Sequence, residues 1–233
     1  MYVRELKDCN LVVTERSWRF ATDHAAAIAR NWTAACARNP KLFDGDVFMV
    51  DQWSIGDGVL AGEVLPAKFA SYLYWRDFGM EAGRQYNEAF VSSVIVSSDG
   101  GILLARAIGG TLNEGLYGSP GGLLDERDVG CEKRLDLVGA AQRELLEETG
   151  LVAGEMVRQP GFLLAHVVPY LAIASVFRSA LSGADLIDRV VKFLKGQEEP
   201  ELEAPRMIYK ATELDELPLT PFGRLLTTHV LGM

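Results

Sequence analysis

Three glutamates lie at helical spacing in residues 143–151, which read Arg-Glu-Leu-Leu-Glu-Glu-Thr-Gly-Leu. In an α-helix, positions i, i+3 and i+4 share one face, so Glu144, Glu147 and Glu148 would present their carboxylates together. Like charges at this spacing destabilise a helix by roughly 0.2–0.5 kcal/mol per pair unless a cation lies between them. Clustered carboxylates suit Mg²⁺ or Mn²⁺, which complete their coordination with water and phosphate oxygens. The pattern therefore predicts divalent-metal chemistry on a phosphorylated substrate.

A solvated helix face is the alternative explanation for any isolated Glu-x-x-Glu-Glu sequence. Here the fixed set is larger, because an arginine and a glycine accompany the three glutamates at set spacing. Each position matches by chance about once in twenty, so a chance match of the whole set over this length is on the order of 10⁻⁴. Chance is therefore a poor explanation.

A glycine-rich turn precedes this segment, since residues 118–122 read Gly-Ser-Pro-Gly-Gly. Without Cβ atoms, the backbone can approach a metal ion or a phosphate closely, although a hinge with no chemical role has the same composition. Asp136 is a suitable N-cap and Gly150 a suitable C-terminal residue, which predicts a helix over Asp136–Thr149. Leu145 and Leu146 would then face the core.

The elements that must hold this helix form a mixed α/β pattern. Phe90–Ser97 and Gly101–Ala107 are apolar runs around a turn, which predicts a β-hairpin. Phe162–Phe177 is typical of one long buried strand, and Asp185–Lys195 of an amphipathic helix. These elements predict an α/β/α sandwich with a mixed sheet.

The first 85 residues predict a small α/β unit in front of that sandwich. Asp23 is expected to cap an alanine-rich helix that ends at Asn39-Pro40. A second helix is expected over Pro66–Phe78. The change in pattern over Met80–Asn87 places a domain boundary there, with residues 1–85 as the N-terminal unit and 86–233 as the catalytic domain.

The composition is that of a globular protein with an acidic surface. The chain has 233 residues, 23 Lys+Arg, 32 Asp+Glu and a formal net charge of −9. This balance argues against a nucleic acid duplex or an anionic membrane as the partner, because both favour basic faces. Cys9, Cys36 and Cys131 predict neither a disulfide framework nor a zinc site, and the charged N-terminus does not fit a signal peptide. We therefore expect a cytoplasmic protein.

Taken together, the glutamate helix and the glycine turn resemble the signature of the Nudix hydrolases. That signature is Gly, five residues, Glu, seven residues, then Arg-Glu-aliphatic-x-Glu-Glu-x-Gly-aliphatic. Residues 143–151 match its second half throughout, and Gly121-Gly122 match its start. Gly122 and Arg143 are 21 positions apart, which is seven more than the pattern has. Either Asp128 takes the place of the first glutamate and the extra residues follow it, or they come earlier and Leu135 takes that place.

The resemblance implies an Mg²⁺- or Mn²⁺-dependent hydrolase that cleaves a nucleoside diphosphate linked to another group. It implies Glu147 and Glu148 as the principal metal ligands and Glu144 as a third ligand or the base for water. By the same resemblance, Arg143 orients a glutamate, and the carbonyl of Gly121 or Gly122 completes the metal shell. The catalytic residues so implied are Arg143, Glu144 and Glu148.

Two further segments resemble a Nudix subgroup that cleaves UDP-glucose and UDP-galactose to UMP and a sugar 1-phosphate. They are residues 39–45, Asn-Pro-Lys-Leu-Phe-Asp-Gly, and 74–78, Tyr-Trp-Arg-Asp-Phe. A nucleoside diphosphate sugar such as UDP-glucose is therefore the expected substrate. The alternatives are an ADP-ribose or dinucleoside polyphosphate pyrophosphatase, and a non-catalytic Nudix-fold protein that binds nucleotides or regulates.

Other side chains are candidates for substrate contacts. Tyr74 and Trp75 could stack a base, while Arg84 and Arg106 could bind phosphate, although core and surface positions are the commoner fates of such residues. By the same resemblance, an acidic loop before the last strand can supply an additional base or metal ligand, and Glu201 is the candidate; a solvated run of charges is the alternative. The N-terminal unit would build a homodimer interface, cover the substrate, or do both.

Overall fold

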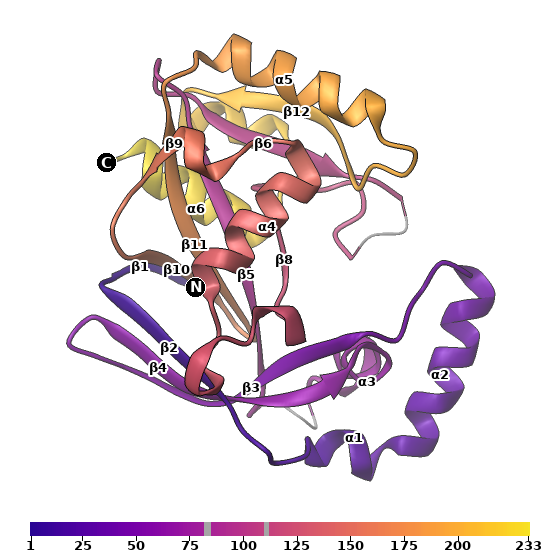
Figure 1. Cartoon of the computed structure of the whole chain (residues 1–233). Helices are drawn as coiled ribbons and strands as arrows, with labels where there is room; N and C mark the ends of the chain where they lie inside the picture. Colours follow the sequence, from indigo (N-terminus) through magenta and orange to yellow (C-terminus); the bar gives the residue numbers. More distant parts are fainter. Residues whose placement is uncertain (82–84, 110–111) are drawn as a thin grey trace.

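A computed structural model describes residues 1–81, 85–109 and 112–233 of the chain (Figure 1). The strands are β1 (Tyr2–Leu6), β2 (Asp8–Val13), β3 (Asp46–Gly56), β4 (Val59–Lys68), β5 (Asn87–Val96), β6 (Ile102–Ala107), β7 (Tyr117–Gly118), β8 (Gly121–Leu123), β9 (Met156–Arg158), β10 (Phe162–Val167), β11 (Tyr170–Ser179) and β12 (Leu202–Ile208). The α-helices are α1 (Arg19–Asp23), α2 (Ala25–Arg38), α3 (Phe69–Tyr74), α4 (Leu137–Thr149), α5 (Gly183–Gly196) and α6 (Pro221–Leu231).

Strand β5 is the centre of a mixed sheet. The strands hydrogen bond in the order β1-β10-β11-β5-β3-β4-β2. β5 runs parallel to β11 and antiparallel to β3, β6 and β8. Because β8 contains Gly121 and Gly122, this pairing holds the glycine turn against the centre of the sheet.

Helices cover both faces of the sheet, as Figure 1 shows for α4 and α6. Successive side chains of a strand point to opposite faces, so Val94 and Ile95 of β5 enter different cores. Ile95 packs with Leu145 of α4, and Val94 packs with Leu226 of α6. This arrangement confirms the predicted mixed α/β sandwich. Within the described residues, no helix combines the length and apolar character needed to cross a membrane.

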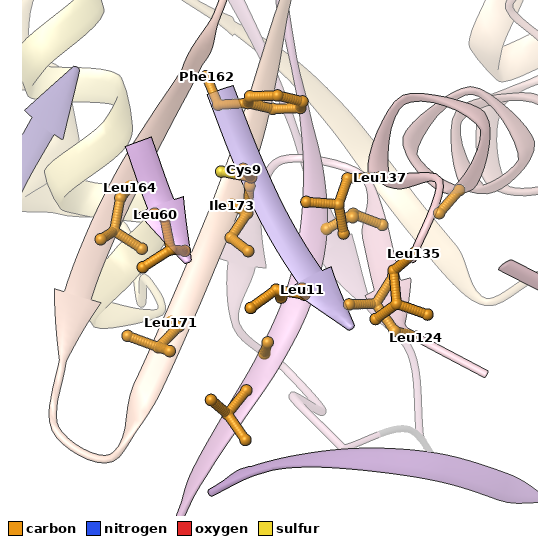
Figure 2. Close-up of a cluster of buried hydrophobic side chains, with 14 of the residues drawn as sticks. Cys9, Leu11, Leu60, Leu124, Leu135, Leu137, Phe162, Leu164, Leu171 and Ile173 are labelled. Atoms are coloured by element: carbon orange, nitrogen blue, oxygen red, sulfur yellow. The ribbon is translucent and has the colours of Figure 1, made fainter. Parts of the chain in front are cut away.

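The N-terminal strands share both the sheet and a core with the strands that follow. β1 pairs with β10, and β3 pairs with β5. Figure 2 shows Leu11 of β2 and Leu60 of β4 in one buried cluster with Leu164 of β10 and Ile173 of β11. The boundary at residue 85 stays a prediction, and packing continues across it.

Three local predictions differ from the structure. Phe162–Phe177 is two antiparallel strands, β10 and β11, because the chain reverses at the Val168-Pro169 turn. Pro66 lies in β4, opposite Phe48. Asp23 ends α1 instead of capping α2, whose N-cap position is His24.

The helix predicted from Pro66 begins only at Phe69, where a distant loop caps it. The carbonyl of Gly45 accepts a hydrogen bond from Phe69 N–H, and Asp44 Oδ1 accepts one from Ala70 N–H at 2.7 Å. These two bonds satisfy donors that the first turn of a helix leaves without partners. The Phe-Asp-Gly part of residues 39–45 therefore holds α3 in place.

Glu88 is a buried carboxyl at the junction of β3, β5 and β11. Its residue is 5% exposed, and Tyr72 Oη donates a hydrogen bond to Glu88 Oε2 at 2.6 Å. Burial raises the pKa of Glu88 to about 7, against smaller lowering effects of Tyr72 and Arg76. The folded state thus binds this proton more tightly than the unfolded state, in which the ordinary pKa is 4.5. This group therefore lowers the stability as the pH rises from about 4.5 to about 7.

We predict that Glu88→Gln will remove this part of the pH dependence. Relative to the unchanged protein, the variant should gain about 3 kcal/mol in free energy of unfolding between pH 4.5 and pH 8, whatever constant offset the amide adds. Urea unfolding at both pH values measures this gain, with the exposed Glu198→Gln as the control. If the free energy of unfolding of Glu88→Gln changed with pH in parallel with that of the unchanged protein, the prediction would be wrong.

Candidate active site

Helix α4 displays the glutamates as its sequence requires. Asp136 caps its N-terminus by accepting a hydrogen bond from Gly139 N–H, and Gly150 ends it in the left-handed conformation at φ 69°. Both boundary predictions are confirmed. Leu145 is fully buried against the sheet, but Leu146 is 49% exposed, so the prediction that Leu146 faces the core is wrong. The helix is anchored by one apolar stripe, which leaves the acidic face free of the core.

The glycine turn lies directly beside two of the glutamates. Gly121 N–H donates a hydrogen bond to Glu148 Oε2 at 2.8 Å. A Cβ atom on Gly122 would come within 2.5 Å of the Glu144 carboxyl carbon, and one on Gly121 within 2.1 Å of the Val91 carbonyl oxygen. Gly121 has no room for a side chain, because backbone atoms of β5 surround it, and a side chain on Gly122 would displace the Glu144 carboxyl where β8 passes between β5 and α4.

Arg143 connects three acidic side chains. Its Nη2 donates to both oxygens of Asp128 at 3.0 and 3.1 Å, and its Nη1 donates to Glu144 at 2.6 Å and to Glu147 at 3.2 Å. The Asp128 side chain is only 3% exposed, and that of Arg143 is 20% exposed. One guanidinium nitrogen thus faces both oxygens of a buried carboxylate, and this charge-assisted contact helps to fix the direction of the guanidinium group.

Five residues separate Gly122 from Asp128, as in the family pattern, and the fourteen residues 129–142 separate Asp128 from Arg143, where the pattern has seven. Asp136 N–H donates a hydrogen bond to the Asp128 carbonyl at 2.8 Å, so residues 129–135 form a closed loop of seven residues. With this loop as the extra segment, Asp128 lies at the position of the first glutamate. Leu135 packs instead in the apolar cluster with Leu137, so its side chain belongs to the core.

The acidic side chains raise the proton affinity of one another. Burial raises the pKa of Glu148 well above its ordinary value, and the charges of Glu144, Glu201 and Glu147 add to this effect while Gly121 N–H opposes it. Burial also raises the pKa of Glu144; Arg143 opposes that rise, and Glu147 and Glu201 reinforce it. Glu201, chosen from the sequence as an additional base or ligand, thus lies close enough to act on both glutamates. A cation would relieve this repulsion.

Three contacts hold the loop that carries Glu201, and one of them is with the glutamate helix. Gln197 Nε2 donates to the Glu147 carbonyl at 3.0 Å, and Ile108 N–H donates to the Glu201 carbonyl at 3.0 Å. Lys41 Nζ lies 2.7 Å from Glu199 Oε1. The contacts of Lys41 and Gln197 were not predicted from the sequence, although Lys41 lies in residues 39–45, because no spacing links either residue to the glutamates.

The donor set fits a divalent cation. Three carboxylates on one helix face, with Glu201 nearby, supply the hard oxygens that Mg²⁺ and Mn²⁺ prefer. In the described part of the chain, no three His, Cys, Asp or Glu side chains already surround one metal position. Arg143 holds Glu144 and Glu147 instead, so ligation would require their carboxylates to turn from the guanidinium group.

The remaining sequence candidates have different surroundings. Arg106 Nη2 lies 3.0 Å from Glu203 on the paired strand β12. Trp75 is fully buried in the N-terminal core, which contradicts a base-stacking role for it in this structure. Tyr74 is partly exposed and packs beside Phe78, with ring centroids 5.7 Å apart. Arg84 lies outside the described residues.

Residues 88–225 match the family model of the NUDIX domain, which is more than half of the chain. The matched region contains the glycine turn and all of α4. No curated protein sequence matches the chain.

Solved structures with a similar fold include the MutT protein from Methanosarcina mazei Go1. It is 21% identical with a TM-score of 0.42, and the alignment covers 62% of this chain and 92% of that one. A Nudix hydrolase from M. smegmatis, RenU, is 15% identical with a TM-score of 0.40, over 62% and 82%. The NUDIX domain of Shewanella oneidensis NrtR, solved with ADP ribose, is 16% identical with a TM-score of 0.40, over 67% and 94%.

Proposed function

The chain belongs to the NUDIX domain family and is a pyrophosphatase-type hydrolase, and on that premise we propose that it cleaves a nucleoside diphosphate sugar such as UDP-glucose with the help of Mg²⁺ or Mn²⁺. The products would be a nucleoside monophosphate and a sugar 1-phosphate. The single observation that carries the proposal is the contact of α4 with the glycine turn, where Gly121 N–H binds Glu148 and Gly122 lies under Glu144.

In the proposed reaction, water attacks one phosphorus of the diphosphate, the bridging P–O bond breaks, and the bridging oxygen leaves with the other phosphate. When bound, the metal would neutralise phosphate charge and lower the pKa of a bound water. We propose Glu147, Glu148 and the carbonyl of Gly122 as its ligands, with Glu144 as either a third ligand or the base for water.

The side chains of the site have distinct roles in this proposal. Arg143 orients Glu144 through its contact with Oε1, which leaves Oε2 of Glu144 to receive a proton from the attacking water. Glu201 is proposed as an additional base or ligand.

The choice of a sugar substrate rests on residues 39–45 and 74–78, which resemble the UDP-glucose subgroup. The structure adds a physical reason to retain the first segment, because its Lys41 reaches the loop that carries Glu201. A cation at this place could meet the negative charge of a substrate in a chain of net charge −9. Hydrolysis of ADP-ribose or dinucleoside polyphosphates is the alternative activity.

A substrate panel tests the proposal. UDP-glucose, UDP-galactose, ADP-ribose, NADH and diadenosine polyphosphates are incubated with the protein in Mg²⁺, in Mn²⁺ and in EDTA. We expect metal-dependent release of UMP and glucose 1-phosphate from UDP-glucose as the fastest reaction. Faster cleavage of ADP-ribose would replace the substrate but keep the enzyme. Metal-dependent product from none of them would favour a protein that only binds nucleotides.

A further inference from the structure

Residues 129–135 form a loop whose two ends lie close together. Val129 and Leu135 form an antiparallel bridge, and Asp136 N–H donates to the Asp128 carbonyl at 2.8 Å. Gly130 N–H also donates to the Arg134 carbonyl at 2.8 Å. This segment, here called the excursion, therefore closes on itself at the residue that binds Arg143.

The excursion is bound to the N-terminal strand β2. Leu135 N–H donates to the Leu11 carbonyl at 2.9 Å, and Arg134 forms a bridge with Val12. Arg134 Nη2 donates to the Cys9 carbonyl at 2.8 Å and to Asp8 Oδ2 at 2.7 Å. A surplus segment without a role has no need of so many bonds to a strand more than a hundred residues away.

Side-chain packing anchors the same segment. Figure 2 shows Leu135 close to Leu11, Leu124 and Leu137 in the buried cluster. Leu135 thus joins β2 to the first residue of α4. Strand β2 lies outside residues 88–225, so this support comes from beyond the matched NUDIX domain.

The base of the excursion is Asp128, the residue that holds Arg143 in the site. Asp128 is held by its carbonyl at the base of the excursion and by a capping box, in which its carboxylate accepts a hydrogen bond from Asp125 N–H at 3.0 Å. The same carboxylate holds Arg143 with two bonds, and Arg143 holds Glu144. One continuous set of bonds therefore runs from β2 to the acidic face of α4.

We infer that the excursion is a brace by which β2 positions Asp128 and Arg143, and that Arg134 is a positioning residue for the proposed hydrolase. This inference rests on the proposed function for its kinetic part alone. Arg134 contacts no member of the acidic cluster, so it acts only through the backbone of residues 128–136. If the excursion is held less firmly, the guanidinium group of Arg143 should be misplaced, while all the acidic side chains of the site are still present.

The test compares Arg134→Gln and Arg134→Lys with Lys133→Gln. Lys133 is the matched control because it lies in the same excursion but its side chain pairs with Glu15, whose side chain is 87% exposed. We expect Arg134→Gln to lower kcat about tenfold with KM within about twofold, since a small misplacement of catalytic groups is costly. Arg134→Lys should recover part of kcat, and Lys133→Gln should match the unchanged protein.

A second readout does not need turnover. In Arg134→Gln, amide hydrogen exchange at Leu135 and Asp136 should speed up, and the side-chain NMR signals of Arg143 should shift. If the protein hydrolyses no nucleotide, these two measurements still decide the positioning role, and the proposed function fails separately. Should Arg134→Gln not fold, Asp8→Asn removes the partner carboxylate at a position that is 52% exposed. Unchanged exchange, Arg143 signals and kcat would overturn the inference.

Discussion

Glu148→Gln should abolish metal-dependent hydrolysis while leaving the metal-free protein at least as stable as before. The substitution keeps the size of the side chain and an oxygen that can accept the Gly121 N–H bond. It removes one negative charge from a partly buried cluster in which Glu144, Glu201 and Glu147 all repel it. The loss of a ligand and of that charge should lower kcat by at least about a hundredfold.

Glu148→Gln is expected to lower activity but not the stability of the metal-free protein, so the result differs from that of a variant that merely unfolds. Without metal, Tm should stay the same or rise, because a repelled charge is gone. With Mg²⁺ or Mn²⁺, the unchanged protein should gain Tm and the variant should lack this gain. Differential scanning fluorimetry with and without metal measures both. Glu216→Gln, an exposed glutamate distant in sequence, is the control. Full turnover in Glu148→Gln would contradict the assignment.

The helix of the site could be predicted from sequence because its signals are local. Capping by Asp136, the end at Gly150 and the shared face of the glutamates all follow from spacing along one helix. The glycine turn was predictable for the same reason. Leu146 was placed wrongly because periodicity identifies an apolar residue but not whether a neighbouring element covers it.

Contacts between distant segments could not be predicted from the sequence. Spacing left Asp128 and Leu135 as alternatives, and they are distinguished by the ion pair of Asp128 with Arg143 and by the apolar packing of Leu135. Aromatic residues were ambiguous for a similar reason. Trp75 was a candidate for base stacking, yet its ring lies in the core beside Trp18, with centroids 6.4 Å apart.

Arg143→Met should reduce both stability and activity, because Arg143 is the cation shared by Asp128, Glu144 and Glu147. Removing it leaves the Asp128 carboxylate, 3% exposed, without its charge partner. Breaking a buried pair from one side costs about 3–5 kcal/mol, and urea unfolding should show a loss of that order. Turnover should fall by at least about a hundredfold, since Glu144 loses the group that orients it.

A double-mutant cycle with Asp128→Asn separates the pair from the rest of the site. If the contact of Arg143 with Asp128 dominates the stability loss, the double variant should be more stable than Arg143→Met alone, because the stranded charge is gone. Activity should not recover with it, since neither substitution restores the contact of Arg143 with Glu144. Strictly additive losses of stability would mean that Asp128 tolerates the absence of its partner, and the direction of the guanidinium group would then have to be set by Glu144 and Glu147.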